Sequence, residues 1–168
     1  MHFIGAGPGD PELITVKGRR ILEEADIIVY AGSLVNPAVL QGHKPGAVIY
    51  NSASMHLQEV LDVMINGVKE GKTVARVHTG DPSIYGAVRE QMDALAKKGI
   101  TCEVVPGVSS FVAAAAVLNK EYTLPGVSQT VILTRHEGRT SIPPGQELAA
   151  LAGHRASLAV FLSAAMIE

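Results

Sequence analysis

Phe3-Ile4-Gly5-Ala6-Gly7-Pro8-Gly9-Asp10 is the stretch that decides the fold, because an apolar strand runs directly into a glycine-rich turn. A turn of this kind after a first strand is typical of α/β proteins that bind nucleotide-like ligands. The glycine spacing departs from the dinucleotide pattern Gly-x-Gly-x-x-Gly, and Pro8 removes a backbone donor. Asp10 would also repel a phosphate group. We therefore expect a nucleoside ligand without phosphates.

Short apolar runs alternate with helical patterns along most of the chain. The runs predict five strands, at residues 2–5, 26–31, 47–50, 73–78 and 101–105. The helical patterns are clearest at residues 54–70, 86–98 and 109–118. The last of these helices is nearly all apolar, so we expect it to be buried. This alternation predicts an α/β domain with a glycine-rich loop and a parallel five-stranded sheet over residues 1–118.

Three turns that follow predicted strands are dense in Gly, Pro, Ser and Asp: Gly5–Asp10, Thr79–Gly86 and Pro106–Ser110. The carboxyl ends of parallel strands share one edge of the sheet, and ligands of α/β proteins bind beyond that edge. Glycine also allows the backbone to come close to a ligand. We therefore expect the three turns to meet and to form one binding site.

The chain changes character after Leu118. Residues 119–128 read as a linker, and a strand at 130–135, a short helix at 146–152 and a strand at 158–163 follow it. Two strands and one helix are too few to bury a sheet, so residues 129–168 are interpreted as an incomplete second α/β domain. Unpaired strand edges favour self-association. We expect a homodimer that is less stable than a longer relative.

The composition excludes several classes of partner. With 47% hydrophobic and 18% charged residues the chain is typical of a globular protein, and its net charge of −2 without a basic run disfavours nucleic acid. No apolar stretch is long enough to span a membrane. Cys102 is the single cysteine, which agrees with a reducing cytoplasm. The histidines lack metal-ligand spacing, so we expect no structural metal.

Four motifs together resemble one known family. They are Gly5-Ala-Gly-Pro-Gly-Asp-Pro11, Gly80-Asp-Pro-Ser-Ile-Tyr-Gly86, Pro106-Gly-Val-Ser-Ser110 and Leu133-Thr-Arg135. In order and spacing they resemble the tetrapyrrole methylases of corrin and sirohaem biosynthesis, which use S-adenosylmethionine. Two further stretches, Tyr30–Val35 and Thr134–Thr140, resemble the members that methylate carbon 11 of a corrin-ring precursor. Family members are longer, so the chain is expected to be truncated.

The resemblance implies two α/β domains that hold S-adenosylmethionine between them and release S-adenosylhomocysteine. The implied cofactor contacts are Pro8, Gly80, Asp81, Ile84, Ser109, Ser110 and Leu162. Candidate residues for a carboxylate-rich tetrapyrrole are Tyr85, Arg135, His136 and Arg139. No residue is predicted to be a general base.

Each of these residues also has a purely structural interpretation. Asp81 would satisfy turn amides before Pro82, Tyr85 would pack as part of a lid, and the cationic loop would pair with Glu137. His78, at the end of the fourth strand, is either a proton shuttle near pH 7 or a structural histidine bonded to a loop carbonyl. Three other functions stay open: methylation of uroporphyrinogen, an inactive S-adenosylmethionine-binding fragment, and a nicotinamide-dependent oxidoreductase.

Overall fold

The protein is described by a computed structural model that covers residues 1–138 and 140–166. Its contacts divide the chain into two compact units, Met1–Ala113 and Ala114–Glu168. A five-stranded sheet forms the centre of the first unit, and a pair of strands forms the second.

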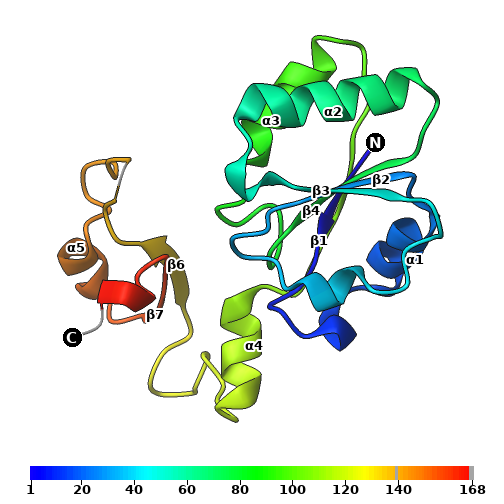
Figure 1. The fold of residues 1–168 in the computed structure, drawn as a ribbon. Coiled ribbons are helices and arrows are strands. Elements are labelled where there is room, and N and C mark those ends of the chain that lie inside the picture. Colours follow the sequence, from blue (N-terminus) through cyan, green and yellow to red (C-terminus); the bar gives the residue numbers. More distant parts are fainter. Residues whose placement is uncertain (139, 167–168) are drawn as a thin grey trace. The chain divides into compact units, whose positions relative to one another are not determined.

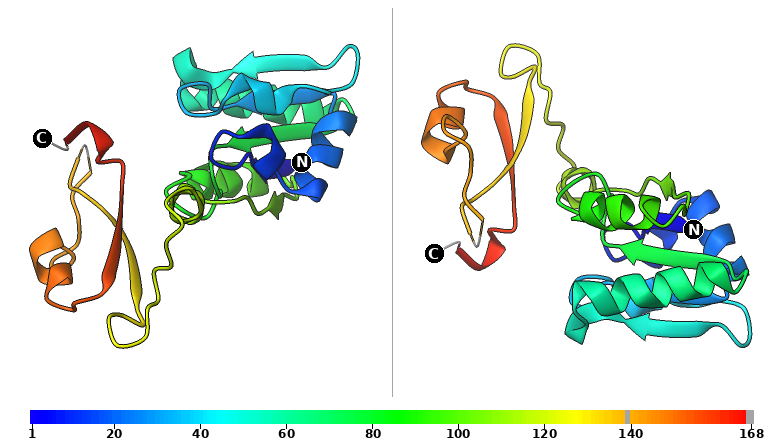
Figure 2. Two further views of the ribbon diagram at one scale, coloured as in Figure 1. Left: turned by 90° about the horizontal axis from the view of Figure 1, so that it is seen from below. Right: turned by 90° about the horizontal axis from the view of Figure 1, so that it is seen from above.

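The sheet of the first unit is entirely parallel, as the alternation of strands and helices predicts. Its strands are β1 (His2–Gly5), β2 (Ile27–Tyr30), β3 (Val48–Asn51), β4 (Val74–His78) and β5 (Glu103–Val105). They lie in the order β3-β2-β4-β1-β5, with β3 at one margin and β5 at the other (Figure 2). The predicted α/β class and the five-stranded sheet are confirmed.

Helices cover both faces of this sheet (Figure 1). They are α1 (Val16–Glu24) on one face, and α2 (Leu57–Lys69) and α3 (Val88–Ala96) on the other. α2 and α3 occupy helical stretches that the sequence predicts. The sequence predicts no definite bounds for α1, because Gly18 and charged residues leave only Ile21 and Leu22 as its buried apolar side chains.

Two apolar clusters fill the space between the sheet and its helices. One contains Ile4, Ile28 and Val77 with the buried side chains of α1, and the other contains Phe3 and Val29 with those of α2 and α3. Neighbouring residues of β1 therefore point into different clusters, as the two-residue period of a strand requires. This packing fixes the ends of the strands that carry the three turns.

The second unit contains β6 (Val131–Arg135), α5 (Leu148–Ala152) and β7 (Ser157–Phe161). β6 and β7 form a parallel pair. Four short 3₁₀ helices also occur among the described residues, at Pro11–Leu13, Pro37–Leu40, Ser52–Ser54 and Ala164–Met166.

The expected burial of the apolar helix after residue 109 is wrong. α4 (Ser110–Val117) has no buried residue, and Val117 is among the exposed large side chains. The two apolar clusters of the first unit contain no residue of α4, so this helix adds nothing to the core between that sheet and its helices. Among the described residues, no helix is both long and apolar enough to cross a membrane.

Candidate functional site

The turns that follow β1 and β4 lie side by side at the carboxyl edge of the sheet. The Gly80 amide donates to the Gly7 carbonyl at 2.7 Å, and the Gly7 amide donates to the Gly80 carbonyl at 3.3 Å. Just before this bridge, the Ala6 amide donates to the His78 carbonyl at 2.8 Å. The ladder between the two strands thus continues into their turns and joins them.

The turn after β5 packs against the other two through glycine backbones. A Cβ on Gly107 would lie 2.2 Å from the Gly80 carbonyl oxygen, and one on Gly5 would lie 2.6 Å from the Gly107 Cα. The Gly107 amide also donates to Asp81 Oδ2 at 2.9 Å. A side chain at Gly5 or Gly107 would force these backbones apart. The predicted convergence of the three turns is confirmed.

The meeting point of the turns is also a switch point of the sheet. β1 and β4 are neighbours, but the chain leaves β1 toward α1 on one face and leaves β4 toward α3 on the other. Ligands of open α/β sheets bind where adjacent connections diverge in this way. The topology and the glycine contacts therefore point to the same place.

All the predicted cofactor residues except Leu162 lie on these turns. Pro8 follows Gly7, Ile84 donates its amide to the Asp81 carbonyl at 3.2 Å, and Ser109 is buried. Gly80 packs close to the Ser109–Ser110 backbone, since a Cβ there would lie 3.7 Å from Ser109 Cα. Leu162 belongs to the second unit, where it follows β7 and is 68% exposed.

The Asp81 carboxylate holds the turns together. Oδ1 accepts from the Ser83 amide at 2.8 Å and from the Ser83 hydroxyl, while Oδ2 accepts from Gly107. Burial raises the pKa of Asp81, but these hydrogen bonds outweigh burial and leave the pKa below its ordinary value. The alternative interpretation, in which Asp81 satisfies turn amides, describes these contacts. Asp81 carries the one charged side chain between Gly80 and Gly86.

His78 does not fit the proton-shuttle interpretation. It is 5% exposed, and burial, followed by repulsion from Arg76, lowers its pKa to about 3. The ring is therefore neutral near pH 7. It stacks on Phe3 with centroids 5.8 Å apart, and its Nε2 has no hydrogen-bond partner among the described residues. The structural alternative is a ring that bonds to a loop carbonyl, and in the part of the chain that the structure describes Nε2 does not make such a bond.

The predicted substrate residues divide between the two units. Tyr85 lies on the turn after β4 and is exposed, with a left-handed φ of 53°. The Arg135 guanidinium donates to the carbonyls of His136, Thr140 and Ser141 at 3.0–3.2 Å, so it folds its own loop. His136 Nδ1 donates to the Glu137 carbonyl at 2.7 Å. Arg139 lies outside the described residues.

Two residues that support the site were not predicted. Asn36 Nδ2 donates to the Gly9 carbonyl at 2.7 Å and fixes the first turn. Thr15 caps α1 by accepting from the Gly18 amide, and its hydroxyl reaches the Pro106 carbonyl at 3.5 Å. Thr15 precedes a helix as a capping residue does, which is a readable signal. The partner of Asn36 lies 27 residues away and leaves no such signal.

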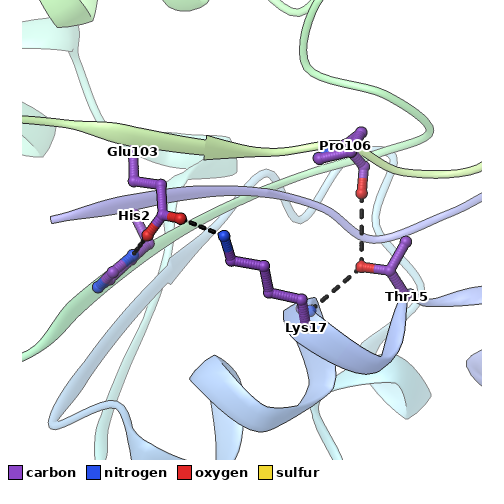
Figure 3. A network of polar contacts seen from close by, with 6 residues as sticks. His2, Thr15, Lys17, Glu103 and Pro106 are labelled. Carbon is purple, nitrogen blue, oxygen red and sulfur yellow. Dashed lines mark hydrogen bonds and ion pairs between the residues drawn. The ribbon is translucent and has the colours of Figure 1, made fainter.

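Figure 3 shows Thr15 and Pro106 beside a second group of polar contacts. Glu103 of β5 pairs with Lys17 of α1 and with His2 of β1, whose Nδ1 lies 3.0 Å from the carboxylate. The hydrogen bond from Lys17 is the main reason that the pKa of Glu103 lies below its ordinary value. These partly exposed pairs join β1, α1 and β5 at the amino ends of the two strands.

The site offers mostly backbone groups to a ligand. The three turns contain no Lys or Arg, so they lack the cations that usually hold a phosphate. Backbone N–H and C=O groups with two carboxylates, Asp10 and Asp81, suit a nucleoside, including one with a positive charge. Within residues 1–138 and 140–166, no group of three or more His, Cys, Asp or Glu side chains is placed to hold a metal ion.

The chain belongs to the family of tetrapyrrole (corrin/porphyrin) methylases. The model of this family matches residues 1–168. A cobalt-precorrin-4 C(11)-methyltransferase of Methanocaldococcus jannaschii is 59% identical to the chain over 166 residues, which are 99% of this chain and 64% of that protein. The chain therefore spans less than two thirds of the length of this relative.

Solved structures of the family agree with the fold. A crystal structure of a cobalt-precorrin-4 methyltransferase is similar to this chain with a TM-score of 0.94 and 51% identity, over 98% of this chain and 69% of that one. A uroporphyrin-III C-methyltransferase of Thermus thermophilus, solved in complex with S-adenosylhomocysteine, has a TM-score of 0.76 and 28% identity, over 98% and 66% of the two chains.

Proposed function

We propose that the protein is an S-adenosylmethionine-dependent methyltransferase of cobalamin biosynthesis that methylates carbon 11 of precorrin-4 or cobalt-precorrin-4. The observation that carries this proposal is the convergence of three glycine-rich turns at the carboxyl edge of β1, β4 and β5. The names of the similar proteins support the choice of substrate.

The residues present fit S-adenosylmethionine. The ligand has a nucleoside, an amino acid and a positively charged sulfur, but no phosphate. Turns without Lys or Arg would not repel the sulfur cation, and their carbonyl groups would stabilise it. We propose that Pro8, Gly80, Asp81, Ile84, Ser109 and Ser110 hold the cofactor, together with Leu162.

The chain contributes to the reaction mainly by positioning. Bound S-adenosylmethionine supplies a methyl group that is already activated by its sulfonium. Asp81 and the glycine contacts hold the turns rigid, and a rigid site that orients two reactants and excludes water lowers a barrier by about 7–11 kcal/mol. Methyl transfer would break the methyl–sulfur bond, form a carbon–carbon bond to the ring, pass the positive charge to the ring and leave neutral S-adenosylhomocysteine. No residue of the chain is assigned as a general base.

We also propose the remaining features of the whole protein. The acetate and propionate groups of the ring would be bound by Arg135, His136, Arg139 and Tyr85. Arg135 would offer the ring fewer N–H groups, because its guanidinium already donates to carbonyls of its own loop. The edges of the β6–β7 pair favour a homodimer. The single Cys102 supports a cytoplasmic location.

Turnover tests this function. The 168-residue chain is incubated with methyl-labelled S-adenosylmethionine and either precorrin-4 or cobalt-precorrin-4, and the tetrapyrrole is analysed by mass spectrometry for one added methyl group at carbon 11. We expect the Asp81→Asn variant to lose at least about tenfold in rate, because it gives up a charged hydrogen-bond acceptor. Asp93→Asn, on an exposed face of α3, is the matched control.

Two outcomes would contradict the proposal. Methylation of uroporphyrinogen-III without methylation of either precorrin would assign a different acceptor within the family. Binding of S-adenosylhomocysteine without any turnover would make this chain a cofactor-binding piece of a longer enzyme.

A further inference from the structure

Arg76 is a buried cation in the middle of β4. It is 7% exposed, and its register partners Phe3 and Val29 are fully buried apolar residues. Its Nε donates to Gln91 Oε1 at 3.1 Å, and its Nη1 donates to the Ser52 hydroxyl at 3.0 Å and the Val29 carbonyl at 3.3 Å. No ion pair among the described residues includes Arg76, and burial lowers its pKa to about 10.

Burying a charge without a carboxylate partner costs free energy, so the neutral groups that accept hydrogen bonds from Arg76 must offset that cost. Gln91, on α3, is 5% exposed and makes two bonds in different directions. Because a guanidinium can only donate, Gln91 Oε1 must face Arg76. This leaves Nε2 to donate to the Ala87 carbonyl, at 3.2 Å. Arg76 therefore fixes the orientation of the amide that holds Ala87.

Ala87 ends the turn that starts at Gly80, and its backbone is strained. Its φ and ψ are 50° and 35°, and Tyr85 has a φ of 53°. The left-handed region is unfavourable for residues other than glycine, and such strain persists only where the surroundings impose it. Ala87 has no polar side chain with which to cap α3 or to hold its own conformation. The side-chain bond from Gln91 Nε2 to the Ala87 carbonyl ties this strained residue to α3.

The two ends of the turn are thus held in different ways. Gly80 and Asp81 are fixed by Gly7 and Gly107 at the edge of the sheet. Ala87 is fixed by the side chain of Gln91, which Arg76 orients in turn. Between the two ends, a Cβ on Gly86 would lie 2.3 Å from the Pro82 carbonyl oxygen, so the turn folds tightly back on itself. Its middle residues include Ile84 and Tyr85.

We propose that Arg76 and Gln91 are positioning residues that set the conformation of the Gly80–Ala87 turn and thereby the shape of the cofactor site. The inference rests on the proposed function only in assigning this turn to the cofactor. An arginine is suited to the role because its planar guanidinium donates to Gln91 and Ser52 at the same time from separate nitrogens. A lysine has a single nitrogen.

The test combines Gln91→Leu with Ala87→Gly. Gln91→Leu removes both amide bonds, so we expect faster hydrogen exchange of the Ile84 amide and a loss of about three- to tenfold in affinity for S-adenosylhomocysteine. Ala87→Gly removes the strain at position 87, since glycine adopts a positive φ readily. In the Gln91→Leu background it should restore both quantities, whereas a packing defect would not be repaired.

Exchange is measured by mass spectrometry on the unliganded chain, and affinity by calorimetric titration. Gln58→Leu is the matched control, because Gln58 is exposed on α2 and its side chain donates to Asp62 of the same helix. Gln91→Glu is a second variant that keeps an acceptor for Arg76 but, when ionised, has no donor for Ala87. It should fold stably and still show faster exchange in the turn.

Unchanged exchange in Gln91→Leu and Gln91→Glu, or a defect that Ala87→Gly does not repair, would overturn the inference. If the unmodified chain fails to bind S-adenosylhomocysteine, the proposed function fails, while the exchange data still decide whether Gln91 holds the turn.

Discussion

The two units use strands of similar length and composition with different results. Every residue of β4 is buried, and helices cover both faces of its sheet. β7 has five residues, as β4 has, but none of them is buried, and in its partner β6 only Thr134 is. An apolar run makes a strand in both places. Burial requires further strands at its edges and helices on its faces, and only the first unit supplies them within the described residues.

This difference bears on function because the three converging turns all belong to the first unit. Their backbones are held by contacts within that unit, from the Gly7–Gly80 bridge to the Asp81–Gly107 bond. We therefore expect the cofactor turns to keep their structure whatever the state of the second unit. Leu162 and the loop around Arg135 depend instead on a sheet of two strands.

Hydrogen exchange should show the largest contrast between the units. Backbone amides of β4 should exchange at least about a thousandfold more slowly than those of β7, because opening β4 requires unfolding of the core. The measurement is exchange followed by mass spectrometry near neutral pH. Equal protection of the two strands would mean that the second unit has a core of its own, and the comparison would fail.

The same substitution placed in each unit sharpens the comparison. Gly107→Ala puts a Cβ 2.2 Å from the Gly80 carbonyl oxygen and should lower the free energy of unfolding by about 3 kcal/mol. Gly138→Ala, in the second unit, meets no atom within 4 Å and should change it by less than about 0.5 kcal/mol. Urea denaturation followed by circular dichroism provides both values. Equal effects would contradict the close packing of the three turns.

The smallest expected effect is a pH dependence that arises in the first unit. The pKa of His78 is about 3 in the folded protein, against 6.5 for an ordinary histidine, so the unfolded chain binds the proton more readily. The stability that depends on neutral His78 is therefore complete above pH 6.5 and is lost as the pH falls toward 3. Between pH 7.5 and 5 the loss should be about 2 kcal/mol.

The His78→Phe variant keeps a ring that can stack on Phe3 but cannot take up a proton. Between pH 7.5 and 5 its free energy of unfolding should fall by about 2 kcal/mol less than that of the unmodified protein. His154→Gln, at an exposed position of the second unit, is the control and should behave like the unmodified protein. Parallel pH profiles for all three proteins would show that burial of His78 has no such effect.

The sequence predicts the first unit well because its signals are local. The apolar run at residues 2–5 ends at a glycine turn, and the face of α2 repeats with the helical period, so each element is visible in a short window. The convergence of the turns also follows from chain order, since parallel strands share one edge. The apolar pattern of α4 is equally local, but burial depends on what covers a helix, and this expectation was wrong.

The supporting contacts of the site are not local and were not predicted. Asn36 reaches Gly9, and Arg76 reaches Gln91 and Ser52, across separations that no short window contains. A readable signal for Arg76 exists, because an arginine between apolar residues of a predicted buried strand needs polar partners. Its identity as a positioning residue depends on the strained backbone at Ala87, which the sequence does not reveal.

Calorimetric titration of the 168-residue chain with S-adenosylhomocysteine, with NAD as the comparison ligand, tests the central claim most directly. The claim is that three converging turns without cations bind a nucleoside that carries no phosphate. We expect S-adenosylhomocysteine to bind with micromolar affinity, NAD not to bind, and Gly107→Ala to abolish the heat of binding. Binding of NAD, or the absence of binding by S-adenosylhomocysteine, would contradict the claim.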